Sequence, residues 1–265
     1  MSEGEKAIEL EVEVAGTPEE VWHAIATGPG ITSWYVPHTV EEREGGTATA
    51  SFGEGPEMQV PGRVATWEPP HRIIFDGGEG VGGLAFEWLI EARDGGSSVV
   101  RLVNSGFGDG GEWDDQYDAM TDGWRLFLSN LQLHRRHFPG QGAVSMMPVG
   151  MWSVPRAEAW ERLTTALGIP SGARPGDRIS ATAGDGLHLA GTVREAVTPT
   201  SLTVLLDEPT PGTAILAAEG GGDMSSVSIW SYLYGPDAAA TVGRDRAPWQ
   251  AWLDEHAPAT NGEGS

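Results

Sequence analysis

The chain has 265 residues, which is enough for one large domain or for two domains of ordinary size. Its formal net charge of -22 comes from 38 acidic and 16 basic residues, so we expect no nucleic acid partner and no association with anionic membranes. It contains no cysteine, which excludes disulfides and thiolate chemistry, and its 39% hydrophobic content is typical of a soluble globular protein.

The first residues, MSEGEKAIELEVEV, lack a basic segment followed by an apolar one, so we expect no signal peptide. No apolar run in the sequence approaches the ~20 residues of a membrane span. These two observations together predict a cytoplasmic protein. Residues 8–14, IELEVEV, alternate apolar and acidic side chains, which predicts a strand with one solvated face.

A capped helix is predicted next, from Pro18 to Thr27. Thr17 and Glu20 form the T-x-x-E pattern of a capping box, and proline suits the first helical position. After the break Gly28-Pro29-Gly30, a second short helix is expected over Ile31–Tyr35. This segment ends in the aromatic pair Trp34-Tyr35, which could be ordinary core or one wall of a cavity.

Six strands follow in the prediction, separated by turns rich in glycine and proline. They are expected at 40–44, 47–52, 58–68, 72–76, 84–92 and 98–105. A long helix then runs from Trp113 to His137, with apolar residues at steps of three and four on one face. Strands with short turns predict an antiparallel meander, and such a sheet can bury its apolar face against this helix.

The order strand, two short helices, six strands and long helix resembles the helix-grip fold of the START-like (SRPBCC) superfamily, in particular its heat-shock-chaperone ATPase-activator branch. The stretches that carry the resemblance are TPEEVWHAIAT, ITSWYVP, GRVATWEPPHRIIF, SSVVRLVNSGF and DGWRLFLSNLQLH. It covers about residues 8–138. It implies an α+β fold in which a curved antiparallel sheet wraps the long helix and leaves a cavity, with Trp34-Tyr35 near the mouth.

A second, weaker copy of the same order is indicated between residues 144 and 256. There AEAWERLTTALG parallels EEVWHAIATGPG, and APWQAWL parallels DGWRLFL. We therefore predict a tandem of two helix-grip domains: a complete one at 1–140 with a pocket, a degenerate one at 144–256, and a disordered tail at 257–265. The second copy has no counterpart of SWYVP, and its last helix is predicted only from Pro248 to His256. We expect it to be structural and to rely on the first copy for cover.

The residues predicted to bind a ligand are mostly aromatic and lie in the first copy: Trp34, Tyr35, Phe52, Met58, Val60, Phe86, Trp88, Phe107, Trp113, Trp124 and Leu128. Aromatic walls with few polar groups suit a small apolar ligand, and core packing is the alternative for each residue. Gly123 lies inside the long helix at a cost of ~1 kcal/mol relative to alanine, so it either admits a neighbouring strand or opens space. Polar pocket groups could be Arg63, Glu87, Arg101 or Gln116.

No other constellation points to chemistry. His134 and His137 lie three apart on the long helix without a nearby carboxylate, so we expect no metal. The acidic run at 109–118 is read as a helix cap and not as a calcium loop, since the EF-hand pattern is absent. No phosphate-binding or nucleophile motif occurs, so no catalytic residue and no cofactor are assigned.

The predicted function is the binding of a small hydrophobic molecule in the N-terminal cavity. One alternative is a co-chaperone-like module that binds a protein partner. The other is an enzyme similar to polyketide cyclases and dehydratases, which the resemblance to the wider superfamily implies. An enzyme of that kind needs an acid/base pair, and the sequence shows none, so we favour a binding protein.

Overall fold

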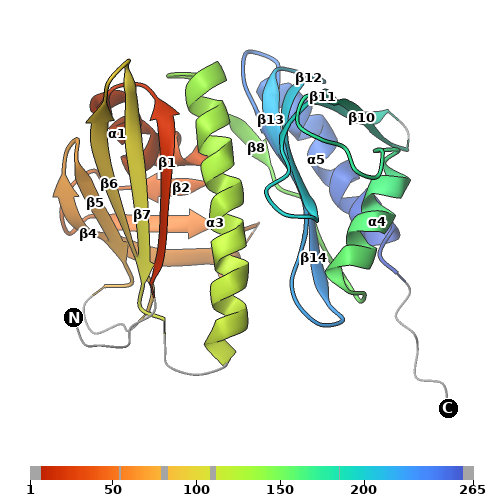
Figure 1. The fold of residues 1–265 in the computed structure, drawn as a ribbon, viewed down its shortest axis with the longest axis horizontal. Helices are drawn as coiled ribbons and strands as arrows, with labels where there is room; N and C mark the ends of the chain where they lie inside the picture. The colour runs from red at the N-terminus through yellow and green to blue at the C-terminus, as the bar shows by residue number, and fades with distance from the viewer. Residues whose placement is uncertain (1–6, 54, 79–82, 108–111, 185, 259–265) are drawn as a thin grey trace. The chain divides into compact units, whose positions relative to one another are not determined.

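The computed structural model (Figure 1) describes residues 7–258 apart from 54, 79–82, 108–111 and 185, and it describes only the backbone of 112–116. The chain divides into two compact units, Met1–Gly142 and Ala143–Ser265. Each unit contains a seven-stranded antiparallel sheet together with helices. The predicted α+β class with two helix-grip copies is thereby confirmed.

The first unit follows the predicted order of elements. They are β1 (Ile8–Ala15), α1 (Pro18–Ala26), α2 (Gly28–Thr32), β2 (His38–Val40), β3 (Thr47–Ser51), the 3-10 helix η1 (Pro56–Met58), β4 (Gln59–Glu68), β5 (Arg72–Asp76), β6 (Ala85–Arg93), β7 (Ser97–Ser105) and α3 (Glu112–His137). The strand order is β1-β7-β6-β5-β4-β3-β2, so the meander closes by placing the first strand beside the last. In Figure 1, α3 runs alongside β1.

The alternation predicted for β1 is present in its burial. Ile8 and Val14 are buried, and the three glutamates between them are exposed. β1 pairs antiparallel with β7. The exposed face of this pair carries an ion pair, in which Arg101 Nη2 lies 3.0 Å from Glu11 Oε2.

The predicted capping box is present at the start of α1. The amide of Glu20 donates to Thr17 Oγ1 over 3.4 Å, and the amide of Thr17 donates to Glu20 Oε2 over 3.0 Å. The second short helix was predicted wrongly at Ile31–Tyr35, because α2 spans Gly28–Thr32. Thr27 caps it by accepting a hydrogen bond from the amide of Gly30 over 3.1 Å. A glycine-proline start had indicated a break, although proline suits the first turn of a helix.

The first strand of the predicted meander was also misplaced. β2 ends at Val40, and residues 41–46 form a turn. Glu41 Oε2 holds this turn by accepting from the amide of Thr47 over 3.0 Å and from Arg43 Nη2 over 2.8 Å. Met58 closes η1 and does not begin a strand. In the first place the Glu41 side chain holds a turn, and in the second Pro56 begins a 3-10 helix. A period-two pattern reveals neither of these local features.

The second unit repeats this architecture with fewer elements. They are β8 (Val144–Met146), β9 (Val149–Trp152), α4 (Arg156–Ala166), β10 (Arg178–Ala183), β11 (Leu187–Glu195), β12 (Ser201–Glu208), β13 (Gly212–Glu219), β14 (Ser225–Leu233) and α5 (Ala238–Glu255). β9 precedes the first helix and pairs with the last strand, β14, as β1 pairs with β7. In the described part of this unit, no second short helix follows α4.

The short final helix predicted for the second copy is wrong. α5 has 18 residues and continues through Pro248, which the prediction took as its first residue. Its apolar residues Val242, Trp249 and Leu253 are buried. They join a core cluster made entirely of residues from the second unit, including Leu163 of α4 and Ile229 of β14. We expected the second copy to rely on the first because its final helix was predicted to be too short to cover its sheet. Since α5 has 18 residues, that reason no longer applies.

No helix in the described ranges combines the length and the apolar character that crossing a membrane requires. The predicted disordered tail lies, from residue 259 onward, outside the described residues.

Candidate functional site

The first unit encloses a cavity of about 620 Å³, within the size range of small-molecule sites. Helices α1, α2 and α3, the segment after α2, and strands β2 to β6 all contribute to its wall. The described lining residues are Ile25, Ile31, Trp34, Tyr35, His38, Ala48, Thr49, Ala50, Phe52, Val60, Pro61, Gly62, Phe75, Asp76, Gly77, Gly83, Leu84, Phe86, Trp88, Met120, Gly123, Trp124 and Phe127. Most of them are apolar, so the site favours an apolar occupant.

Three tryptophans from three different elements form the inner wall. Trp34, Trp88 and Trp124 are each less than a tenth exposed. The rings of Trp34 and Trp88 meet edge to face at 5.8 Å, and those of Trp88 and Trp124 at 5.5 Å. The indole Nε1 of Trp34 donates to the Ala24 carbonyl oxygen over 2.8 Å, so its polar atom is satisfied within the protein. This wall therefore presents ring surface to a ligand.

Tyr35 links the wall to the rim. Its ring lies 5.0 Å from that of Trp124 and 4.4 Å from that of Phe127, both on α3. It also meets the ring of Phe52 at 6.3 Å. Phe52 and Val60 are 39% and 55% exposed, so they lie where the cavity opens to solvent. The aromatic pair after α2 thus has two positions, with Trp34 inside and Tyr35 toward the mouth.

His38 is held at the cavity by its own neighbourhood. Its Nδ1–H donates to the Val36 carbonyl oxygen over 2.8 Å, and its backbone amide donates to Thr32 Oγ1 over 3.0 Å. A Cβ on Gly28 would lie only 2.9 Å from the His38 carbonyl oxygen, so glycine is needed for α2 to approach β2. Burial lowers the pKa of His38, while the bond to Val36 acts in the opposite direction. The ring is therefore neutral at pH 7.

Two further ionisable groups line the cavity. Burial raises the pKa of Tyr35 well above its usual range, so it stays a neutral phenol. The carboxylate of Asp76 accepts from Arg63 Nε over 2.9 Å and Arg63 Nη2 over 3.3 Å, and from the Gly78 amide over 2.9 Å. The bonds from Arg63 are the main cause that holds the pKa of Asp76 below its usual value. Asp76 is thus ionised and already paired.

Seven of the eleven predicted ligand-binding residues lie around the cavity: Trp34, Tyr35, Phe52, Val60, Phe86, Trp88 and Trp124. Leu128 is buried in the core cluster of the first unit, outside the lining. Phe107 is buried and packs against the ring of Tyr117 at 5.3 Å. Met58, at the end of η1, is 38% exposed and does not line the cavity. The side chain of Trp113 lies outside the described residues.

Of the four polar candidates, the three with described side chains, Arg63, Glu87 and Arg101, do not line the cavity. Arg63 reaches it only through Asp76. Glu87 accepts from Arg72 Nε over 2.6 Å, and Arg101 pairs with Glu11. The side chain of Gln116 is outside the described residues. His38 and Asp76 were missed because neither lies in a periodic pattern, although the short spacing between His38 and Tyr35 was a usable signal. Gly123 does line the cavity.

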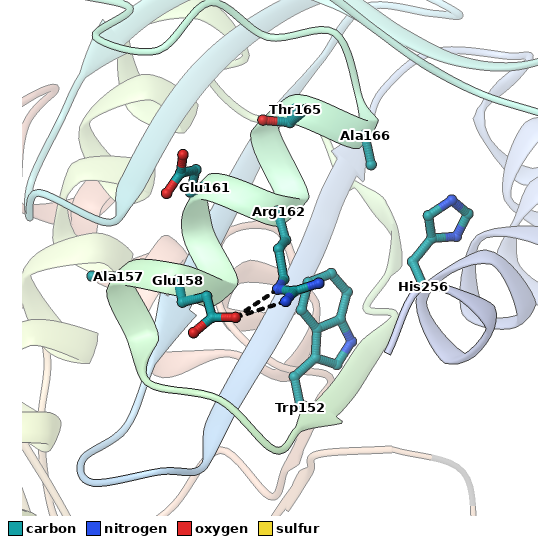
Figure 2. A pocket seen from close by; sticks show the side chains of 8 residues that line it. All are labelled: Trp152, Ala157, Glu158, Glu161, Arg162, Thr165, Ala166 and His256. Atoms are coloured by element: carbon teal, nitrogen blue, oxygen red, sulfur yellow. Dashed lines mark hydrogen bonds and ion pairs between the residues drawn. The ribbon is translucent and has the colours of Figure 1, made fainter. Parts of the chain in front are cut away.

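A second concavity lies in the second unit, on the surface of α4 and the end of α5 (Figure 2). Figure 2 shows Glu158 and Arg162 extending from α4, with His256 across the groove. Arg162 is paired with Glu158 at 2.7 Å, and the His256 ring stacks on Trp252 at 4.0 Å. Trp152 is fully buried, and its Nε1 donates to the Leu253 carbonyl oxygen over 3.2 Å. This groove is open and lies among charged side chains, of which Glu158 and Arg162 pair with each other, so it is a weaker candidate than the apolar cavity.

No group of three or more histidine, aspartate or glutamate side chains is placed to hold a metal ion within the described ranges. His134, one of the two histidines near the end of the long helix, is buried. Its pKa is lowered to about 4, first by burial and then by the charges of Arg135 and His23. The acidic run at 109–118 falls largely outside the described side chains.

Comparison with known proteins gives one family. Residues 15–134 match the model described as activator of Hsp90 ATPase homolog 1-like protein, which confirms the resemblance of the first copy. No curated protein matches the chain. Among solved structures, the Aha1 dimer of Colwellia psychrerythraea is 17% identical, with 51% of this chain and 99% of that chain covered and a TM-score of 0.43.

Two similar structures extend over nearly the whole chain. The di-domain ARO/CYC BexL of the BE-7585A biosynthetic pathway is 15% identical, with 96% of this chain and 99% of that chain covered and a TM-score of 0.45. DynU16, from the dynemicin biosynthetic locus, is 21% identical, with 93% and 96% covered and a TM-score of 0.43.

Proposed function

We propose that the first unit, in which residues 15–134 match the activator of Hsp90 ATPase homolog 1-like family, binds a small hydrophobic molecule in its cavity. The observation that carries this proposal is the cavity of about 620 Å³ with its inner wall of Trp34, Trp88 and Trp124. A packed protein interior rarely leaves a void larger than a few water molecules. A space of this size with apolar walls gains free energy when an apolar molecule displaces its water.

The rim supports the same proposal. Phe52 and Val60 expose apolar surface at the opening, where a hydrophobic molecule would first make contact. Tyr35 and His38 add a few polar groups to otherwise apolar walls, which is the usual composition of a site that orients its ligand. The second unit is assigned a structural role, because its concavity is an open groove lined by charged side chains and not an apolar cavity.

The decisive experiment is ligand titration of the full chain, preceded by native mass spectrometry of protein purified from its source. A retained molecule would identify the ligand directly. In titrations with lipids and neutral aromatic compounds, a ligand should change tryptophan emission in a saturable way and raise the melting temperature, as mass action requires. If emission and melting temperature stay unchanged across the whole series, the binding proposal is wrong.

The two alternatives give different results in the same titration. A module that binds only a protein partner would leave emission unchanged with every small molecule. An enzyme would bind the ligand and also change its mass during incubation. Tyr35 and His38 are the lining residues that could transfer protons in that case, so the product should disappear in Tyr35→Phe or His38→Leu.

A further inference from the structure

The polar groups of the cavity are few and differ in what they can offer a ligand. Among the described lining residues there is no lysine and no arginine, and the ionisable ones are Tyr35, His38 and Asp76. A ligand anion would therefore meet no cation that lines the site. A carboxylate that enters this largely apolar space would lose its hydration without gaining an ion pair, which is costly.

The charge of Asp76 is already compensated. Arg63 approaches it with two guanidinium nitrogens, at 2.9 and 3.3 Å, and the amide of Gly78 donates to the same carboxylate. This fork-shaped pairing occupies the directions in which a guanidinium could bind a ligand carboxylate. Neither member of the pair is thus available to hold a charged ligand, whether acidic or basic.

His38 offers a defined hydrogen-bond acceptor. Because a carbonyl oxygen can only accept, the bond of 2.8 Å to the Val36 oxygen requires that Nδ1 carry the proton. In the neutral imidazole, Nε2 then has a free lone pair, and no hydrogen bond joins Nε2 to any described residue. The centroid of the His38 ring lies 5.5 Å from that of the Tyr35 ring. Nε2 can therefore accept a hydrogen bond from a ligand.

From this arrangement we infer that the cavity selects a neutral aromatic or polycyclic molecule bearing a hydroxyl group, with that hydroxyl donating to Nε2 of His38. Carboxylates, fatty acids included, are rejected. This inference rests on the proposed function and specifies the chemistry of its ligand. The rings of Trp34, Trp88 and Trp124 contact the flat apolar part of the ligand, and His38 accepts a hydrogen bond from its hydroxyl group.

Four probes with the same bicyclic body separate the contributions. Naphthalene tests the cavity itself, and 2-naphthol adds a hydroxyl that can donate and accept. 2-Methoxynaphthalene keeps an oxygen that only accepts, and 2-naphthoate adds a negative charge. Affinities are measured by calorimetry at pH 7 on the full chain, for the wild type, for His38→Leu and for His38→Gln, whose amide oxygen restores an acceptor.

The wild type should bind 2-naphthol about 5- to 10-fold more tightly than 2-methoxynaphthalene, as one net hydrogen bond allows, and 2-naphthoate more weakly than naphthalene. His38→Leu should bring the two neutral oxygen-bearing probes within about 2-fold of each other, and His38→Gln should restore part of the difference.

If naphthalene binds but 2-naphthol binds no better than its methyl ether, or if 2-naphthoate binds best, the inference is overturned while the proposed function survives. If the wild type binds none of the four probes, the inference is overturned, while the proposed function is decided by the wider titration with lipids and other aromatic compounds. The comparison of probes on the wild type alone is decisive even if a His38 variant fails to fold.

Discussion

The side-chain amide of Asn130, in the C-terminal half of α3, donates to the main-chain carbonyl oxygen of Trp34 over 2.8 Å, although the two residues are 96 positions apart in the sequence. Asn130 is fully buried and Trp34 nearly so. This bond fastens the segment after α2 to the long helix at the point where both contribute to the cavity wall. The buried amide of Asn130 therefore helps to hold Trp34 in its position in the cavity wall.

The first prediction concerns this bond. Asn130→Ala should lower the free energy of unfolding by about 1–3 kcal/mol, because the Trp34 carbonyl would stay buried without its donor. Gln132→Ala is the matched control, since its amide makes a similar bond of 2.9 Å to the Glu13 carbonyl oxygen in an exposed position. It should cost less than about 0.5 kcal/mol. Urea unfolding followed by circular dichroism measures both, and equal losses would contradict the prediction.

The second prediction concerns Gly123, which lines the cavity from within α3. Gly123→Leu should fill part of the space and weaken binding of an apolar ligand at least about tenfold, as steric overlap with a ligand costs more than 1.4 kcal/mol. Gly123→Ala adds one methyl group and should raise the free energy of unfolding by up to about 1 kcal/mol through helix propensity. Calorimetric titration and urea unfolding test the pair. Unaltered ligand affinity in Gly123→Leu would place the ligand elsewhere.

The third prediction concerns pH. The pKa of His134 is about 4 in the folded chain, below the 6.5 of a free side chain, because burial and the charges of Arg135 and His23 oppose its protonation. As pH falls, the unfolded chain takes up this proton first. The free energy of unfolding should therefore decline between pH 6.5 and 4, by about 3 kcal/mol in all, and His134 should cause no further loss below that range.

His134→Gln keeps a polar side chain and removes the titration, so its stability should fall less over this interval. His71→Gln, which replaces a histidine at an exposed position, is measured beside it as a control for the substitution itself. Urea unfolding at several pH values provides the comparison. Parallel curves for the wild type and His134→Gln would show that other groups dominate.

The fourth prediction concerns the second unit. Trp249 of α5 is fully buried in the core cluster of this unit. Trp249→Ala should cost about 3–5 kcal/mol, as deletion of a large core side chain usually does. Met151→Ala removes a side chain that is 61% exposed and should change the free energy of unfolding by less than about 0.5 kcal/mol. A small effect of Trp249→Ala would indicate that α5 is not part of the core.

The sequence was most informative where burial follows a regular period. The alternation around Val12 and the three- and four-residue spacing around Leu128 located β1 and α3 closely. The capping residues Thr17 and Glu20 located the start of α1. These signals are local and repeat along the chain, so the element order could be predicted.

The sequence was misleading at Pro248, because a proline can begin a helix or lie inside one. Pro248 is common at the start of a helix, and the preceding AAATVGRDRA contains a glycine and a weak apolar period. In the structure, Val242 before the proline and Trp249 and Leu253 after it pack into the same core, which holds the helix together across Pro248. Tertiary packing of this kind leaves little trace in the sequence.

Only some of the cavity residues were predicted, because only some of them lie in a regular pattern. Aromatic residues at inward strand positions were found, because Phe86 and Trp88 follow period two. His38 and Asp76 lie at strand ends, outside any regular period. Asp76 bonds with Arg63, which the pairing of two strands brings close, and His38 bonds with Val36 through a local backbone geometry that the sequence does not reveal.

The pairing of β1 with β7 has a consequence for synthesis on the ribosome. Leu10 lies opposite Leu102, so the first strand has no partner until about 90 more residues have been made. At roughly 5–20 residues per second this takes on the order of 5–20 s. During that interval the strand is an open template for other chains. Its row of carboxylates, Glu9, Glu11 and Glu13, repels such chains, so the nascent protein carries its own protection against misassembly.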